Sequence, residues 1–129
     1  MDKAEYAVQL KHSGYNCAQA VLCAFAQETA LSEEMLKKIG AAYGVGMGCM
    51  EATCGALCAA QILMGLKKYE KRPVLRDAAD LLRQFESLCG ASVCKVLKGR
   101  ETGVVLCECD DCVRNAVRIL QQDNLYGKG

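Results

Sequence analysis

The stretch "GCMEATCGALCAA", residues 48–60, places three cysteines inside a run of small apolar residues. The apolar run continues to Leu66, and its spacing predicts a buried helix from about Ala52 to Lys68. That helix is too short to cross a membrane, which takes roughly 20 apolar residues. The preceding segment, "GAAYGVGMG" at residues 40–48, holds four glycines and predicts a loop. We expect these glycines to let the backbone approach a neighbouring helix or a cysteine site closely.

Helical spacing of apolar residues extends over most of the chain. Asn16, Ser32 and Asp110 are typical N-caps, while Pro73 suits a first helical turn and Gly90 a helix end. No convincing strand pattern is present. The sequence therefore predicts an all-α fold, a compact single-domain helical bundle of about five to six helices with a Gly-rich loop, over residues 1–129. Besides 52–68, helices are expected at 2–12, 16–28, after 32, and at 73–88, 93–98 and 110–122.

Composition limits the classes of function. The 129 residues carry a net charge of +1, so the chain lacks the basic footprint of a nucleic-acid-binding protein. The densest basic segment, "KKYEKR" at residues 67–72, is interpreted as a solvated helix end. The first 14 residues lack the apolar run of a signal peptide, so we expect a cytoplasmic protein without membrane insertion. In that compartment, ten cysteines indicate metal or redox chemistry more often than structural disulfides.

Four cysteines fall in the first turns of four predicted helices, namely Cys17, Cys54, Cys94 and Cys112. A helix N-terminus carries partial positive charge and unpaired N–H groups, which stabilise a thiolate. Thiolates act as nucleophiles, redox groups and metal ligands, and four of them can hold an iron–sulfur cluster or a structural zinc ion. We therefore predict that these four sulfurs meet at one site. The alternative is that they pack as small apolar side chains in the core.

The role of the other cysteines is open. Cys58 follows Cys54 by four residues on the same helix face, so it either lines the site or belongs to the core. Cys23 and Cys89 are interpreted as core residues. Cys49 lies beside the Gly-rich loop, within reach of the site.

A denser cysteine pattern precedes the last predicted helix. Cys107, Cys109 and Cys112 form C-x-C-x2-C, which is a local metal-binding signal. It is not a standard zinc finger, because no second C-x2-C and no H-x3-H accompany it.

The segments "GYNCAQAV", "GMG", "EATCGA", "CKVL" and "CVRNAV" resemble the C_GCAxxG_C_C family of small bacterial proteins, over roughly residues 10–120. The resemblance maps the family's four cysteines onto Cys17, Cys54, Cys94 and Cys112. One departure is Ala59, which stands where the motif has its last glycine. The family is labelled redox-active. It resembles the non-haem part of split-Soret cytochromes, which implies a cysteine-bound iron–sulfur centre.

Three hypotheses follow from the sequence. In the first, Cys17, Cys54, Cys94 and Cys112 hold an iron–sulfur cluster that exchanges electrons with a partner protein. In the second, these thiols cycle between dithiol and disulfide with a thiol partner, and Cys54 and Cys17 are the candidate catalytic residues. We then expect the attacking thiol to be the most exposed of the first-turn cysteines, and choose Cys54. In the third, the chain is a zinc or other metal-binding module without turnover.

The sequence leaves several properties open. It does not decide whether the chain is an enzyme, and it names no substrate or electron partner. A homodimer is expected only from the general behaviour of small helical proteins.

Overall fold

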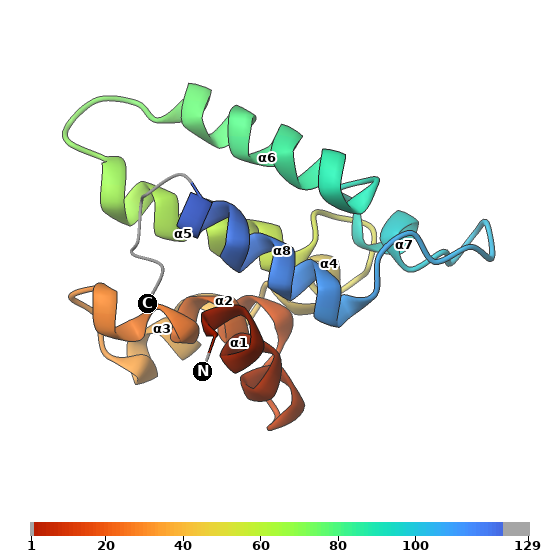
Figure 1. Ribbon diagram of the computed structural model, residues 1–129, viewed down its shortest axis with the longest axis horizontal. Helices are drawn as coiled ribbons and strands as arrows, with labels where there is room; N and C mark the ends of the chain where they lie inside the picture. The colour runs from red at the N-terminus through yellow and green to blue at the C-terminus, as the bar shows by residue number, and fades with distance from the viewer. Residues whose placement is uncertain (1, 123–129) are drawn as a thin grey trace.

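A computed structural model describes residues 2–122 of the chain. These residues form a compact arrangement of helices (Figure 1). Within this part of the chain no strand forms, and the only β-type pairing is an isolated bridge between Thr53 and Val93. The all-α prediction is therefore confirmed. The elements are α1 (Lys3–His12), α2 (Cys17–Ala24), the 3-10 helix η1 (Ala26–Glu28), α3 (Glu33–Gly40), α4 (Gly44–Met47), α5 (Gly55–Lys68), α6 (Leu75–Cys89), α7 (Cys94–Leu97) and α8 (Cys109–Gln122).

The described residues hold more helices than the five to six expected. α4 is not a regular helix, since Val45 and Gly46 have left-handed backbone angles, and seven regular α-helices remain. α7 is a single turn of four residues, next to the Thr53–Val93 bridge. Such a short helix is held by tertiary contacts rather than by its own propensity, because helix nucleation is costly.

Local capping explains where several helices begin. The Asn16 side chain accepts a hydrogen bond from the backbone N–H of Gln19, whose side chain accepts one from the Asn16 backbone in return. Ser32 caps α3 by accepting from the backbone N–H of Met35. Gly90 ends α6 in the left-handed conformation. The predicted roles of Asn16, Ser32 and Gly90 are therefore confirmed.

Other boundaries differ from the prediction by a few residues. α2 ends at Ala24, and residues 26–28 continue as the separate 3-10 helix η1. α5 begins at Gly55 rather than Ala52, because Cys54 itself occupies the N-cap position. α8 begins at Cys109, so Asp110 lies inside its first turn instead of capping it.

The centre of the bundle is built from α2, α5 and α8. Helix α2 packs against α1, α3 and α5, while α8 packs against α1, α5 and α6 (Figure 1). One continuous hydrophobic core joins them and contains fully buried Leu22, Leu57 and Leu120. Ala59 is also fully buried, so its methyl group is accommodated at the position where the motif that the sequence resembles has glycine. Because these three helices touch one another, their N-terminal ends can build a common site.

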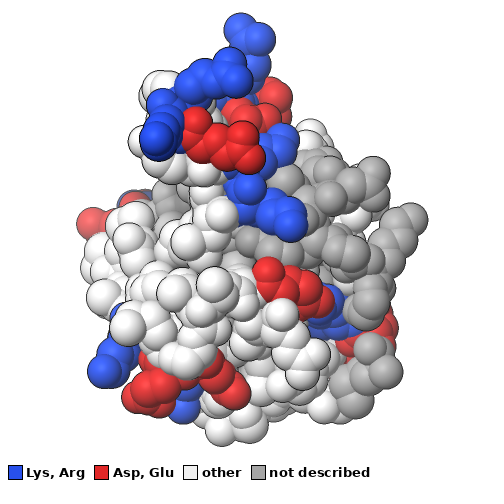
Figure 2. Space-filling model, turned by 90° about the vertical axis from the view of Figure 1, so that its left-hand side faces the viewer, with Lys and Arg blue, Asp and Glu red and all other residues white. Residues whose placement is uncertain are grey.

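The surface mixes charges of both signs. Figure 2 shows Lys and Arg side chains lying next to Asp and Glu over the upper part of one face. Residues 67–72 are exposed at the end of α5, and Lys68 Nζ lies 3.1 Å from Asp77 Oδ1, which confirms the solvated helix end. Among the described residues, no helix combines the length and the apolar character that a membrane crossing requires.

Candidate functional site

Four cysteines from four segments line one pocket of about 280 Å³. They are Cys17, Cys54, Cys94 and Cys109, and Lys98 lies in the same wall. The volume exceeds the ~150 Å³ of an apolar cavity that binds benzene, so the pocket has room for a group of several heavy atoms. Tyr15, Val45 and Met50 supply larger side chains around it.

The starts of helices place these sulfurs. Cys17 is the first residue of α2, directly after its cap Asn16, and Cys109 is the first residue of α8. Cys54 is the N-cap of α5, and its backbone N–H donates to the carbonyl oxygen of Ser92 at 2.8 Å. Cys94 begins the single turn α7, and its N–H donates to the carbonyl oxygen of Ala52 at 2.9 Å. These two backbone bonds tie the Cys54 and Cys94 segments together.

Two glycines allow the backbone to approach the pocket. A Cβ atom on Gly46, whose φ is +56°, would lie 2.5 Å from Cys94 Cβ and 3.4 Å from its sulfur. A Cβ atom on Gly55 would lie 2.6 Å from the carbonyl oxygen of Tyr43. Both distances are shorter than any ordinary contact, so neither position accepts a side chain without movement. The prediction that the glycines permit close approach to a cysteine site is therefore confirmed.

The loop beside the pocket contains an unusual backbone. Val45, Met47 and Met50 all have positive φ angles, of 54°, 60° and 64°. Such angles are uncommon for residues with a side chain, and a β-branched residue such as Val45 is an outlier among them. Val45 and Met50 both line the pocket. Strained backbone is therefore concentrated at the wall of the cysteine site.

Hydrogen bonding makes Cys109 the most acidic thiol of the pocket. The Cys17 S–H donates to Cys109, and this bond, together with the Lys98 ammonium and the charge of Lys11, lowers the pKa of Cys109 to about 5 against the opposing effect of burial. The same bond raises the pKa of Cys17, because it keeps the proton on that sulfur. Although burial opposes it, the thiolates around Lys98 raise its pKa and keep it charged. The arrangement at neutral pH is thus a thiolate held between a thiol and an ammonium group.

Cys54 is the second acidic thiol. A hydrogen bond from Cys112 lowers its pKa to about 7, with further help from the backbone N–H groups of Leu57 and Ala56 at the start of α5 and against the effect of burial. Burial raises the pKa of Cys94, and only Lys98 opposes it appreciably. The helix N-terminus therefore acts on Cys54 as expected from the sequence.

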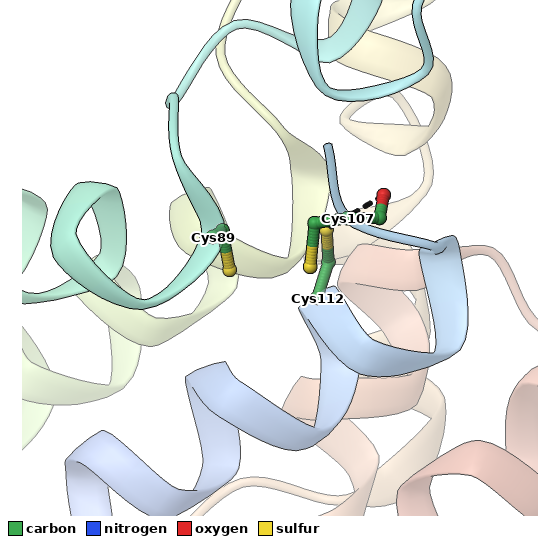
Figure 3. Close-up of side chains that lie close together, drawn as sticks. All are labelled: Cys89, Cys107 and Cys112. Carbon is green, nitrogen blue, oxygen red and sulfur yellow. Dashed lines mark hydrogen bonds between the residues drawn. The ribbon is translucent and has the colours of Figure 1, made fainter. Parts of the chain in front are cut away.

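A second group of cysteines lies behind the pocket. The sulfur atoms of Cys89, Cys107 and Cys112 all lie within 4.8 Å of one another (Figure 3). Cys89 ends α6, Cys107 precedes α8, and Cys112 is in the first turns of α8. Their exposed fractions are only 3%, 8% and 0%. This buried cysteine triad has the donor atoms to hold a metal ion.

Neighbouring groups polarise the triad. A hydrogen bond from Cys112 lowers the pKa of Cys89 to about 6, aided by Asn115, whose Nδ2 lies 3.3 Å from the Cys89 sulfur. Cys112 has one S–H proton, which Cys54 and Cys89 compete to accept, and both partners raise its pKa. Burial raises the pKa of Cys107 to about 12. Cys112 therefore contacts Cys54 of the pocket and both other sulfurs of the triad.

Comparison with known proteins agrees with the sequence motifs. Residues 15–122 match the model of the family described as "Putative redox-active protein (C_GCAxxG_C_C)". The chain belongs to the C_GCAxxG_C_C family. Searches of curated proteins and of solved structures each found no match. The matched segment contains every helical element after α1 and all ten cysteines, so the family assignment covers both groups of sulfurs.

The four family cysteines named from the sequence divide between the two groups. Cys17, Cys54 and Cys94 line the pocket, whereas Cys112 is fully buried, lies off the pocket wall and joins the triad. The expectation that Cys54 is the most exposed of them is wrong, because it is 3% exposed while Cys17 is half-buried. Its N-cap position turns the sulfur inward, toward α8.

The remaining cysteines of this family member are also placed. Cys23 is a core residue as predicted, and its S–H lies 3.8 Å from the carbonyl oxygen of Glu33. Cys58 is buried outside the pocket lining, 3.9 Å from the carbonyl oxygen of Thr53. Cys49 is exposed and does not line the pocket. Cys89 is buried as predicted, but it belongs to the triad rather than to apolar packing alone.

Sequence reasoning missed Cys109 and Lys98 as pocket residues. The C-x-C-x2-C pattern predicts one local cluster. In the structure α8 begins at the second cysteine of this pattern, so that Cys109 lines the pocket while Cys107 and Cys112 belong to the triad. Had the last helix been predicted to start at Cys109 instead of at the cap Asp110, Cys109 would have been recognised as a cysteine at a helix N-terminus, like Cys17. No signal in the sequence singles out Lys98.

Proposed function

We propose that the chain is a redox protein that binds an iron–sulfur cluster in the pocket, with Cys17, Cys54, Cys94 and Cys109 as ligands. The observation that carries this proposal is that four cysteines from four segments face one cavity. Four thiolates are the usual ligand set of such a cluster. When bound, the cluster supplies one-electron transfer, which agrees with the redox label of the family.

The spacing of the sulfurs favours a cluster over a single ion in the pocket. Ligands of one zinc ion lie about 2.3 Å from the metal, which brings all of them within about 4 Å of one another. Among the described residues, the set of sulfurs that meets a 4.8 Å limit is the triad, and no three pocket sulfurs do so. A cluster spreads its ligands over several metal atoms and therefore suits a wider ring of thiols.

The chain's own residues prepare the pocket for this role. Hydrogen bonds and Lys98 stabilise thiolates at Cys109 and Cys54, so ligands are available near neutral pH. The Lys98 ammonium offsets part of the negative charge that thiolate ligands gather. Gly46 and Gly55 bring the backbone close, and Val45 and Met50 add apolar side chains to the pocket wall.

Cys109 replaces Cys112 as the proposed fourth ligand. Cys109 lines the cavity, whereas Cys112 is fully buried outside its lining. Cys112 instead donates a hydrogen bond to Cys54, and hydrogen bonds to ligand sulfurs tune the potential of a cluster.

A thiol–disulfide function is the second candidate, favoured by the contact between Cys17 and Cys109. Both sulfurs are half-buried rather than sealed, and Cys109 is a thiolate. The Cys109 thiolate attacks a partner's disulfide and releases one partner thiolate, which takes the proton of Cys17. Cys17 then attacks the Cys109 sulfur and releases the second partner thiolate, so the partner is reduced and a Cys17–Cys109 disulfide forms.

Anaerobic reconstitution with iron and sulfide tests the proposal. We expect a broad absorption band near 400 nm that reductant bleaches, with iron and acid-labile sulfide bound to the protein. Cys109→Ser should lose the band and Cys112→Ser should retain it with a shifted potential, while exposed Cys49→Ser should behave as the unaltered protein. A chain that stays colourless with correct folding contradicts the cluster. A Cys17–Cys109 disulfide that forms reversibly in such a chain would support the second candidate.

A further inference from the structure

We propose that the buried cysteine triad is a second site, separate from the pocket, which binds one soft cation, Zn²⁺ or Cu⁺, through the sulfurs of Cys89, Cys107 and Cys112. The inference does not depend on a cluster in the pocket. It rests on the position of three sulfurs from three segments within 4.8 Å of one another. In Figure 3 these side chains converge from the end of α6, from the segment before α8 and from α8 itself.

The donor set selects the kind of ion. The triad contains sulfur only, with no carboxylate or histidine among its grouped atoms. Magnesium and calcium require oxygen ligands, whereas thiolates select Zn²⁺, Cu⁺ and iron–sulfur clusters. The mutual distances suit a single ion with metal–sulfur bonds of about 2.3 Å. Three sulfurs within 4.8 Å of one another lie closer together than ligands that are spread over the several metal atoms of a cluster.

Charge and coordination distinguish the two ions. A divalent ion leaves less uncompensated negative charge on three buried thiolates than a monovalent ion does, and buried charge is costly. Three sulfur donors without a fourth suit Cu⁺, because Zn²⁺ in structural sites takes four ligands. Binding of either ion requires thiolates and therefore releases protons to solvent.

A hydrogen-bond donor outside the triad contacts one of its sulfurs. The Asn115 side chain, one turn along α8 from Cys112, donates from Nδ2 to the Cys89 sulfur at 3.3 Å. Donors to ligand atoms fix their orientation, and their loss typically weakens metal affinity about 10- to 100-fold. Asn115 is therefore a positioning residue of this site.

A bound cation would connect parts of the chain that are otherwise weakly joined. The segment between α7 and α8 exposes Val104, Val105 and Leu106. Its return toward the bundle rests on the backbone N–H groups of Leu106 and Cys107, which donate to the carbonyl oxygen of Leu97 at 2.9 and 3.3 Å. A cation held by Cys107 fastens the end of this segment to α6 and α8, which is the role of a structural metal site.

Titration of the reduced, metal-free full-length chain without oxygen tests the site. Zn²⁺ and Cu⁺ are added separately, in competition with a chromogenic chelator, and native mass spectrometry counts bound ions. We expect one equivalent of at least one of the two ions, release of protons, and a higher thermal unfolding midpoint. The stronger competitor against the chelator identifies the preferred ion.

Matched variants assign the bound ion to the triad. Cys107→Ala should abolish stoichiometric binding, and Asn115→Leu should weaken it about 10- to 100-fold. Cys23→Ala, which removes a buried thiol elsewhere in the core, should leave binding unchanged. The pocket variant Cys17→Ala/Cys109→Ala should also retain the ion, although it loses any cluster in the pocket.

Two results would overturn the inference. One is binding by Cys107→Ala equal to that of the unaltered chain, with its helical circular dichroism intact. The other is loss of the ion in the pocket variant together with retention in Cys107→Ala. If Cys107→Ala does not fold, the affinity of Asn115→Leu decides, and an unchanged affinity there contradicts the site. Failure of the cluster appears separately, as absence of bound iron and sulfide.

Discussion

Cys109 shows how neighbours set the chemistry of a single sulfur. Its pKa of about 5 comes first from the Cys17 hydrogen bond and then from Lys98 and Lys11, with burial opposing both. Because the thiolate is the nucleophilic form, a lowered pKa makes the sulfur reactive below neutral pH. Half-buried at the pocket wall, Cys109 is also within reach of a small reagent.

We predict that alkylation of Cys109 in the metal-free, reduced protein is nearly independent of pH from 6 to 8 and slows as pH falls toward about 5. The sign follows from protonation of the thiolate below its pKa. Lys98→Met should move this decline to higher pH, whereas Lys98→Arg should move it little. Iodoacetamide labelling followed by peptide mass spectrometry measures the rates, with exposed Cys49 as internal reference. A decline at the same pH in Lys98→Met would contradict this account.

At the residue scale, the sequence predicted cysteines better than it predicted their neighbours. Cys17 could be found because it follows the cap Asn16, and Cys54 and Cys94 could be found because they fall in the first turns of predicted helices. Cys109 was missed because the position of the α8 start, one residue before Asp110, depends on packing rather than on a cap. Lys98 could not be found, since its role exists only where distant segments meet.

Helix α5 illustrates how one element combines two kinds of glycine. Gly55, at its first position, faces the backbone of Tyr43 at a distance that leaves no space for a methyl group. Gly65 lies near its end, and nothing lies within 4 Å of an added Cβ atom. The first glycine is required by contact with the pocket loop, while the second only adds flexibility to the unfolded chain.

Alanine substitution at these two glycines should therefore have opposite effects. Gly65→Ala should raise the free energy of unfolding by about 0.5–1 kcal/mol, which is the usual advantage of alanine inside a helix. Gly55→Ala should lower it by about 1–3 kcal/mol, because the new methyl group overpacks against the Tyr43 carbonyl. Urea unfolding at equilibrium measures both values. Equal effects of the two substitutions would show that the Gly55 contact is unimportant.

At the element scale, local chemistry decided what could be predicted. The starts of α2 and α3 were correct because Asn16 and Ser32 cap them through bonds within three residues. The short helix expected at 93–98 is present as α7, whereas the left-handed backbone angles of Val45, Met47 and Met50 could not be predicted from the sequence. Both depend on contacts across the chain, such as the bond from the Lys95 N–H to the Met50 carbonyl oxygen at 2.7 Å.

Across the whole molecule, the first and last described helices are joined by ion pairs. The Arg114 guanidinium contacts both carboxylate oxygens of Glu5, at 2.7 and 3.1 Å. Asp110 lies 3.2 Å from Lys11 and 2.8 Å from His12. These pairs hold α1 against α8, whose start carries Cys109. The closure of the bundle and the position of a pocket sulfur therefore depend on the same interface.

A double-mutant cycle at Glu5 and Arg114 tests this closure. Glu5→Gln and Arg114→Met should each lower the free energy of unfolding, and the double variant should lose less than the sum of the two. The favourable coupling should shrink between 0.05 M and 0.5 M NaCl, since salt screens charges near the surface. Lys68 and Asp77, a single ion pair at 3.1 Å, provide the comparison and should couple more weakly. A coupling free energy that does not change with NaCl concentration would contradict an ionic contact between α1 and α8.

At the scale of the whole molecule, the sequence predicted the all-α fold class but not how the helices pack together. Apolar spacing indicated helices throughout, and most of the described residues are helical. The sequence predicted that four sulfurs meet but not how the helices pack. The packing of α2, α5 and α8 places three of the predicted sulfurs in the pocket and the fourth, that of Cys112, in the triad. Cys112 points away from the cavity because the face of α8 that carries it packs into the core, where it is fully buried.

Cys112 has a single S–H proton and several partners that compete for it. While Cys112 shares that proton with Cys54, the Cys54 thiolate is favoured. A cation that displaces the proton by binding at the triad would make Cys54 harder to ionise. Occupancy on one side would then be felt on the other, with equal strength in both directions, as thermodynamic reciprocity demands. Cation binding at the triad would thus change the reduction potential of a cluster bound in the pocket.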